Sequence, residues 1–141
     1  MSRKINFTKI RRKTKKLKAE TPRLIAVEAV NHFKQNFREQ GFVDDRVEPW
    51  KKRKTSNAAD RRTKKRRAIL IDSGDMRRSI RAKMYSFRSI IVGSYGVYYS
   101  RFHNRGAGKL PKRQFIGKSK KLNFKIRLLI FKRLKAAIKS K

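Results

Sequence analysis

Apolar residues recur at helical spacing in a segment that starts at about residue 21. Its apolar side chains fall on one helix face, with spacings of four, three and four positions, at Ala26, Val30, Phe33 and Phe37. Thr21 followed by Pro22 is typical of a helix start, and Gly41 is typical of a helix end. The pattern therefore predicts a helix between these residues that packs on the core.

Residues 119–139 show a second, longer helical pattern. Apolar side chains recur every four positions at Leu122, Ile126, Ile130, Leu134 and Ile138, and others lie alongside at Phe124, Leu128, Leu129 and Phe131. Every charged residue of the segment is basic. A basic amphipathic helix also suits a membrane surface. We favour a role in the core, because the domain is otherwise short of large apolar residues, and we expect no membrane partner.

Short elements are expected between these two helices. Asp72 and Ser73 offer capping oxygens for a small helix that continues to Ile80. Strands are predicted at residues 81–87 and 88–94, with Gly93 ending the second, then a short helix within 95–106 and a strand at 110–115 that opens with Pro111. The predicted fold class is α+β: a small antiparallel sheet packed by an N-terminal helix and a long C-terminal amphipathic helix.

The segments outside this pattern are rich in basic residues. Residues 1–20 hold few apolar side chains, so they are interpreted as a basic N-terminal arm, or as a helix that orders only on a partner. Residues 42–67 lose all periodicity and are interpreted as a long basic loop. A chain of 141 residues has room for one domain, which is expected at residues 21–141.

The net charge is the most unusual property of the chain. Forty-three Lys and Arg stand against nine Asp and Glu, which gives a formal charge of +34, and Asp75 is the last acidic residue. Such a chain repels itself and is expected to meet polyanions, either nucleic acid or acidic protein surfaces. The candidate contact residues are Arg11, Arg12, Lys13, Lys15, Lys16, Lys51, Lys52, Arg53, Lys54, Arg61, Arg62, Lys64, Lys65, Arg66 and Arg67.

The sequence offers little for targeting or for chemistry. The first residues lack the apolar stretch of a secretory signal, and no apolar window is long enough to cross a bilayer. The chain has no cysteine and two histidines, so neither a thiolate nor an imidazole metal cluster is expected. Asp72 and Asp75 are explained by capping and by the helix dipole, and His103 by packing against aromatic residues. We therefore expect no catalytic residues, no metal and no cofactor.

Four short motifs follow one another in a familiar order. They are Pro49-Trp50-Lys51, the segment Ile69 to Ile80, the segment Val92 to Gly106 that includes His103-Asn104-Arg105-Gly106, and the segment Pro111 to Gly117. Their order and spacing, over about residues 33–122, resemble the phage virion morphogenesis family, which includes the Mu-like G proteins and related tail-completion proteins. The motif residues expected to have structural roles are Trp50, Asp72, Ser73, Gly74, Arg77, Gly93, His103, Gly106, Pro111, Arg113, Phe115 and Gly117.

The resemblance implies a structural protein of a tailed phage virion, at the head–tail junction or in the tail, assembled in the host cytoplasm. It implies an oligomeric ring that contacts connector or neck proteins and tail-tube proteins, with packaged DNA as a further, non-specific contact. The chain departs from the family in having no acidic residue after Asp75, so the surface that meets its cations stays open. The alternative hypothesis is a ribosomal-like or nucleoid protein that binds nucleic acid non-specifically.

Overall fold

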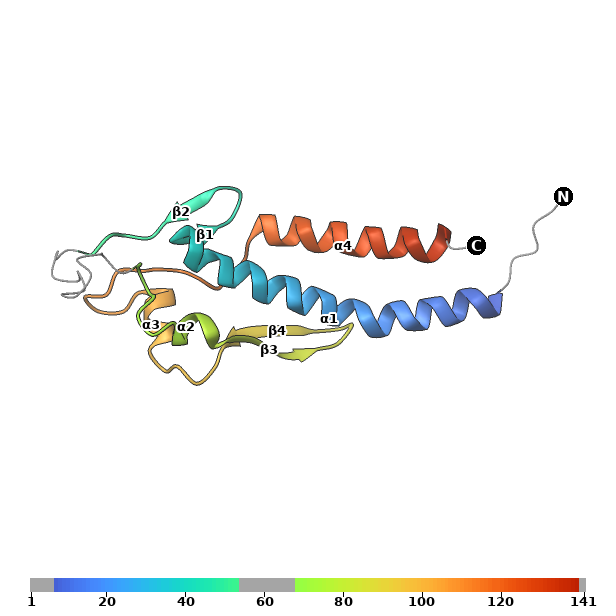
Figure 1. Ribbon diagram of the computed structural model, residues 1–141, viewed down its shortest axis with the longest axis horizontal. Coiled ribbons are helices and arrows are strands. Elements are labelled where there is room, and N and C mark those ends of the chain that lie inside the picture. Colours follow the sequence, from blue (N-terminus) through green and yellow to red (C-terminus); the bar gives the residue numbers. More distant parts are fainter. Residues whose placement is uncertain (1–6, 54–67, 140–141) are drawn as a thin grey trace.

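The computed structural model describes residues 7–53 and 68–139. Its elements, in chain order, are α1 (Phe7–Glu39), β1 (Gly41–Val43), β2 (Val47–Pro49), α2 (Asp75–Arg78), β3 (Ile80–Tyr85), β4 (Ile90–Ser94), α3 (Ser100–Arg105) and α4 (Lys120–Lys139). Helix α1 forms a spine, with α4 alongside it on one side and the β3–β4 hairpin on the other (Figure 1). The predicted α+β fold with an N-terminal and a C-terminal helix is confirmed.

Helix α1 begins fourteen residues earlier than the pattern predicted. The predicted start at Thr21 and Pro22 is wrong, because α1 begins at Phe7 and Pro22 lies inside it. Residues 7–20, expected as an arm, continue the same helix, and α4 runs beside them (Figure 1). Proline has no N–H to donate, and here Thr21 and Pro22 are both buried against the rest of the fold. Packing has therefore overridden the local start signal.

The segment after α1 is folded where the sequence predicted a loop. Strands β1 and β2 form an antiparallel hairpin, and Phe42, Val43 and Trp50 are buried. The helix ends at Glu39 and Gln40 takes the left-handed conformation, with φ of 53°, so Gly41 does not provide the stop. Gly41 is needed for the hairpin, since a Cβ there would lie 2.5 Å from the carbonyl oxygen of Glu48. The remainder of the predicted loop, residues 54–67, lies outside the described residues.

The second hairpin agrees with the prediction. Strands β3 and β4 pair antiparallel, with a register shift between Ala82 and Met84. Gly93 does not end the strand as expected, because it pairs with Arg81 and the strand continues to Ser94. The two hairpins form separate two-stranded sheets.

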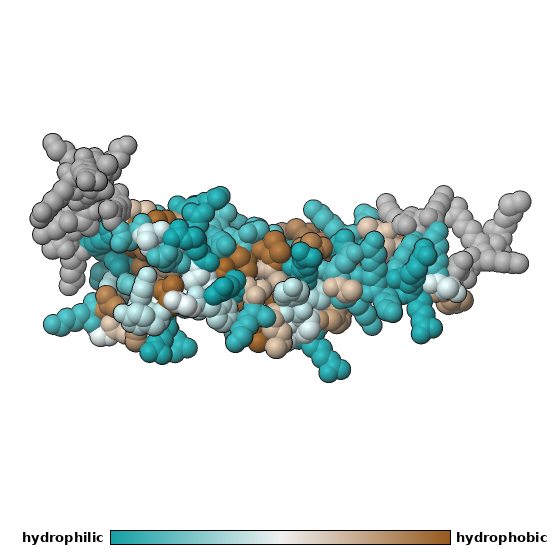
Figure 2. Space-filling model, turned by 60° about the horizontal axis from the view of Figure 1, so that its bottom comes forward, coloured by the Kyte–Doolittle hydropathy of each residue, from teal (hydrophilic) through white to brown (hydrophobic). Residues whose placement is uncertain are grey.

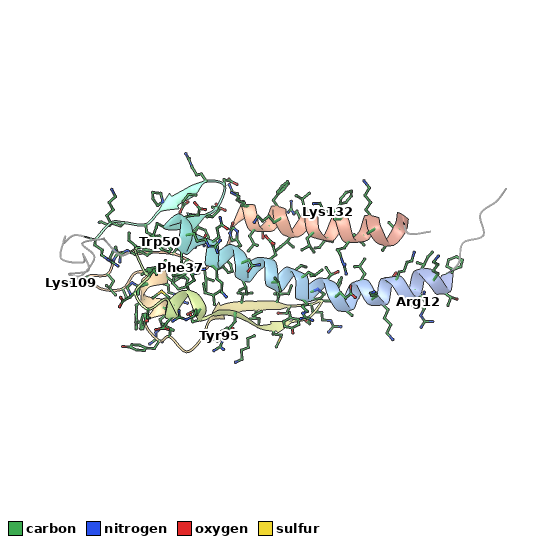
Figure 3. All side chains as sticks on the ribbon, in the orientation of Figure 1. Arg12, Phe37, Trp50, Tyr95, Lys109 and Lys132 are labelled. Atoms are coloured by element: carbon green, nitrogen blue, oxygen red, sulfur yellow. The ribbon has the colours of Figure 1, made fainter. Side chains whose placement is uncertain are left out.

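The apolar core gathers around the second half of α1. Phe37 lies between Trp50 and Phe115, with ring centroids 5.4 and 5.2 Å away. Figure 3 shows Phe37 and Trp50 facing the same region at one end of the molecule. The rest of the buried cluster consists of Ala29, Phe33, Met76, Ile80 and Leu122. Phe115, one of the motif residues expected to have a structural role, is 1% exposed. The first half of α1 and the second half of α4 extend away from this core (Figure 1).

Helix α4 forms as predicted, but its apolar residues divide into two sets. Ser119 caps the helix, since its Oγ accepts the N–H of Leu122 at 3.1 Å and donates to the carbonyl of Val43 at 2.9 Å. Leu122 is buried and Ile126 packs against the core. Ile138, expected on the same core face, is 82% exposed. The prediction of one core-facing stripe is therefore wrong for the end of α4, which runs beyond the core.

Candidate functional site

The segment from Gln114 to Ile116, in the last of the four sequence motifs, is held mainly by side chains. Asn104 accepts the N–H groups of Phe115 and Ile116 at 2.8 and 2.9 Å and donates to the carbonyl of Ile116 at 3.1 Å. Trp50 Nε1 donates to the carbonyl of Gln114 at 2.7 Å. The strand predicted at 110–115 is therefore absent from the described residues, because these side chains take the backbone bonds that a neighbouring strand would make.

Arg113 ties the same segment to the residue after Trp50. Its Nε and Nη2 both donate to the carbonyl of Lys51 at 3.1 Å, and its own N–H donates to the carbonyl of His103 at 2.8 Å. Arg113 is buried, and burial followed by the nearby charge of Arg53 lowers the pKa of its guanidinium. The motif residues Trp50, His103 and Arg113, far apart in sequence, thus meet in one cluster.

A cleft of about 330 Å³ opens beside this cluster. It is lined by the Asp72-Ser73-Gly74 turn and by Tyr99, together with Arg53, His103 and Arg113. The ring of His103 lies edge-on to Tyr99, its Nδ1 makes no hydrogen bond within the described residues, and burial followed by the charge of Arg113 lowers its pKa. A neutral packing histidine explains these observations.

The turn that borders this cleft differs from the expected helix cap. Gly74, with φ of 85°, is the residue that precedes α2. The hydroxyl oxygen of Ser73 accepts a hydrogen bond from the N–H of Asp75 at 3.4 Å. The Asp75 carboxylate accepts from the Ser73 hydroxyl and, at 2.6 Å, from Arg78. These two bonds, the Ser73 bond first, lower the pKa of Asp75. The negative charge of Asp75 is therefore neutralised by Arg78 of the same helix.

The cleft lining includes Asp72, Asp75 and His103, but these side chains do not form a metal site in the part of the chain that the structure describes. No cluster of three or more His, Asp or Glu side chains able to hold an ion occurs within residues 7–53 and 68–139. Cations form part of the lining, at Arg53 and Arg113. The arrangement suits a scaffold that fixes loops against each other.

Two other motif residues, Gly106 and Gly117, are important because a side chain at either position would clash with a neighbouring segment. Gly106 has φ of 77°, and a Cβ there would lie 3.0 Å from the backbone nitrogen of Lys112. A Cβ at Gly117 would lie 1.9 Å from the side-chain nitrogen of Gln114. Both glycines let the segments around Phe115 approach closely. Arg77 lies in α2 and Pro111 begins the extended segment, where each is partly exposed.

The predicted contact residues lie at two separate places. Arg11, Arg12, Lys13, Lys15 and Lys16 are on the first turns of α1, all exposed except the half-buried Lys13. Lys51, Lys52 and Arg53 are exposed at the opposite end of the molecule, next to Trp50, as the labels of Arg12 and Trp50 show (Figure 3). Lys54, Arg61, Arg62, Lys64, Lys65, Arg66 and Arg67 lie outside the described residues. The structure therefore does not bring the two basic groups together.

A sequence model of one family matches residues 4–135, which is most of the chain. That family is the phage virion morphogenesis family. The chain belongs to it. No curated protein and no solved structure gives a match. The match extends beyond the predicted span of about 33–122 and includes the first turns of α1 and most of α4.

Family membership gives the chain a role in building the phage virion, in contact with other virion components. The quoted motifs consist largely of residues that hold the fold together, such as Trp50, Asn104 and Phe115. Among the described residues, no helix has the length and apolar character needed to span a membrane.

Two functional features were missed by sequence reasoning. Helix α4 carries eight basic and no acidic residues, yet none of them was included among the candidate contacts. Two of them pair with α1: Arg133 with Glu20, and Lys125 with Glu28 at 3.0 Å.

The second feature is an apolar stripe on the outer face of α4. The sequence does contain a signal for this stripe, because Phe124, Leu128 and Phe131 lie alongside the predicted core stripe. Hydrophilic side chains dominate the face drawn in Figure 2, with hydrophobic ones in separate patches.

Proposed function

We propose that this family member is a non-catalytic tail-completion or neck component at the head–tail junction of a tailed bacteriophage. It assembles in the host cytoplasm as a homo-oligomeric ring that contacts connector or neck proteins and tail-tube proteins. Its exposed cations make non-specific contacts with packaged DNA or with acidic neighbouring subunits.

One observation carries this proposal: basic groups lie at the two ends of a long helix. Helix α1 has 33 residues, which at the usual rise corresponds to about 50 Å. Exposed cations lie near its start, at Arg11, Arg12, Lys15 and Lys16, and beyond its end, at Lys51, Lys52 and Arg53. A single small ligand cannot reach both groups. A subunit wedged between larger anionic bodies can use both at once.

The motif cluster supports the non-catalytic part of the proposal. The polar groups of Asn104, Arg113 and Trp50 are used in bonds to backbone carbonyl and N–H groups of the same chain. Asp75 is paired with Arg78. These residues hold the fold together and present no aligned nucleophile and base.

The test is loss of the chain during phage growth. A nonsense mutation in its gene should yield filled heads and separate tails that join when the purified protein is added. A labelled copy should appear at the head–tail junction in electron micrographs. Intact particles from the mutant, or co-sedimentation of the chain with ribosomes or chromosomal DNA in place of virions, would refute the proposal and favour the nucleic-acid-binding alternative.

A further inference from the structure

Helix α4 has two apolar faces that point in opposite directions. One face, with Leu122, packs on the core beside α1. The other carries Phe124, Phe131 and Ile138, which are 62%, 61% and 82% exposed, and the less exposed Leu128. Successive residues of a helix are about 100° apart, so these positions lie roughly opposite Leu122. Exposed phenylalanines in line on one helix are unusual for a free surface.

The outer stripe has the spacing of a coiled-coil seam. Positions 124, 128, 131, 135 and 138 alternate in steps of four and three, which is the heptad repeat. Four of them are apolar, and the fifth is Lys135, a single charged residue of the kind that fixes register in such seams. The stripe extends over about 20 Å of helix, enough for a short two-helix contact.

The residues that flank the seam decide what can cover it. In heptad terms the flanking positions include Lys125, Arg127 and Lys132. Lys125 is paired with Glu28, whereas Arg127 and Lys132 make no ion pair within the described part of the chain. Helix α4 has no acidic residue. A second copy, parallel or antiparallel, would therefore bring Arg127 and Lys132 against cations of its own α4 and would supply no carboxylate to pair with them.

We propose that the outer face of α4 is the basic half of a two-helix coiled coil, whose other half is an acidic amphipathic helix of a different virion protein. Apolar residues of that helix cover Phe124, Leu128, Phe131 and Ile138, and its carboxylates pair with Arg127 and Lys132. DNA would satisfy these cations but offers no cover for the phenylalanines. The inference rests on the proposed function and deepens it by specifying the neighbour's chemistry.

The first test uses the full-length chain and two synthetic peptides of identical composition. One peptide has Leu at the seam positions and Glu at the flanking positions of four heptads. The other contains the same residues with the heptad order scrambled. Fluorescence anisotropy at 0.15 M salt should show binding of the heptad peptide about tenfold tighter or more. Equal affinities would mean simple charge attraction and would overturn the inference.

Variants locate the contact on α4. Phe124→Ser with Phe131→Ser should weaken binding of the heptad peptide about tenfold or more, with the fold checked by circular dichroism. The matched control is Phe87→Ser, which changes a phenylalanine of similar exposure, 67%, in the loop between β3 and β4, and should leave binding unchanged. Arg127→Glu with Lys132→Glu should shift the preference to a peptide flanked by Lys. Binding that ignores these changes contradicts the inference.

Other occupants give their own results. Dimerisation of the chain in sedimentation equilibrium that Phe131→Ser abolishes would assign the stripe to a second copy. Binding to vesicles of anionic phospholipid that Phe131→Ser abolishes would assign it to a lipid surface. Either result overturns the inference. Incorporation of the native chain into particles is measured separately, so failure of peptide binding and failure of the virion role are distinguished.

Discussion

The side chain of Asn36 and the carbonyl of Phe115 are joined by a hydrogen bond of 2.9 Å across 79 positions of the chain. The same amide accepts the N–H of Val43 at 3.1 Å. Both Asn36 and Phe115 are almost fully buried. One side chain of α1 thus fixes β1 and the last family motif together.

Replacement of Asn36 by Ala should therefore lower the free energy of unfolding by about 2 to 4 kcal/mol, because the buried N–H of Val43 and carbonyl of Phe115 lose their partner. Urea denaturation measures the effect. Asn31→Ala, an exposed position of the same helix, is the control and should change stability by less than about 0.5 kcal/mol. Equal effects of the two substitutions would show that the Asn36 bonds contribute nothing.

The ring of Phe115 should contribute more than that hydrogen bond. It packs against Phe37 in the buried cluster, so Phe115→Ala is expected to cost about 3 to 5 kcal/mol of unfolding free energy. Thermal melts compare it with Phe87→Ala, which removes an exposed ring and should have little effect. A decrease below about 1 kcal/mol for Phe115→Ala would mean that the ring is not the centre of the core.

Local signals predicted the elements whose stability depends on nearby residues. The β3–β4 hairpin, α3 and α4 follow from strand propensity, short turns and helical spacing. The start of α1 could not be predicted, because the Glu20 partner Arg133 lies 113 positions away. The extended run through Phe115 was predicted as a strand, because its bonding to Asn36, Trp50 and Asn104 cannot be read from sequence spacing.

The candidate site, too, could be predicted only in part, because its arrangement depends on residues far apart in the sequence. Cations could be counted in the sequence, but the sequence could not show that Arg12 and Trp50, each next to a basic group, lie at opposite ends of the molecule (Figure 3). It also could not separate the two faces of α4, since Leu122 and Phe124 are both large and apolar and only the position of α1 decides which is covered.

Acidification should destabilise the fold through His32. Its Nε2–H donates to the carbonyl of Val43 at 3.1 Å, and the ring is 3% exposed. Burial is the main reason that its pKa lies below the ordinary value of 6.5, and the charges of Lys125 and Lys121 act in the same direction. The unfolded chain then binds a proton at a higher pH than the folded chain, so stability falls as pH drops below about 6.5.

The measurement is urea unfolding at pH 7.5 and pH 5.5. The native chain should lose stability toward pH 5.5, by at most about 1.4 kcal/mol per pH unit for this group. His32→Gln should lose less over the same interval, and the lowered pKa of His103 contributes the remainder in the same direction. A pH dependence that is the same in the variant would contradict the assignment to His32.

Binding to DNA should depend steeply on salt and not on base sequence. If about ten phosphates are neutralised, log affinity falls against log salt with a slope near −9. Replacing the exposed Arg11, Arg12, Lys15 and Lys16 by Gln should reduce the slope by about 0.9 for each phosphate that the variant no longer neutralises. The charge-matched control replaces exposed cations elsewhere, at Arg81, Lys83, Arg88 and Arg101. A slope near zero for the native chain, or equal reductions in both variants, would contradict DNA binding through the start of α1.

Packing against α4 should hold the first turns of α1 in their helical conformation. Leu17 is half-buried and lines a groove with Ala136, Ala137 and Arg133 of α4, so Leu17→Ser weakens the packing between the helices. Lys18→Ser makes a comparable change in helix propensity at an exposed position. Amide hydrogen exchange in residues 11–18 should accelerate about tenfold more in the Leu17 variant, which corresponds to about 1.4 kcal/mol of local opening free energy. Exchange at Phe37 should not change in either variant, since the core lies elsewhere. Equal acceleration in the two variants would mean that this part of α1 is helical by its own propensity and that α4 does not hold it.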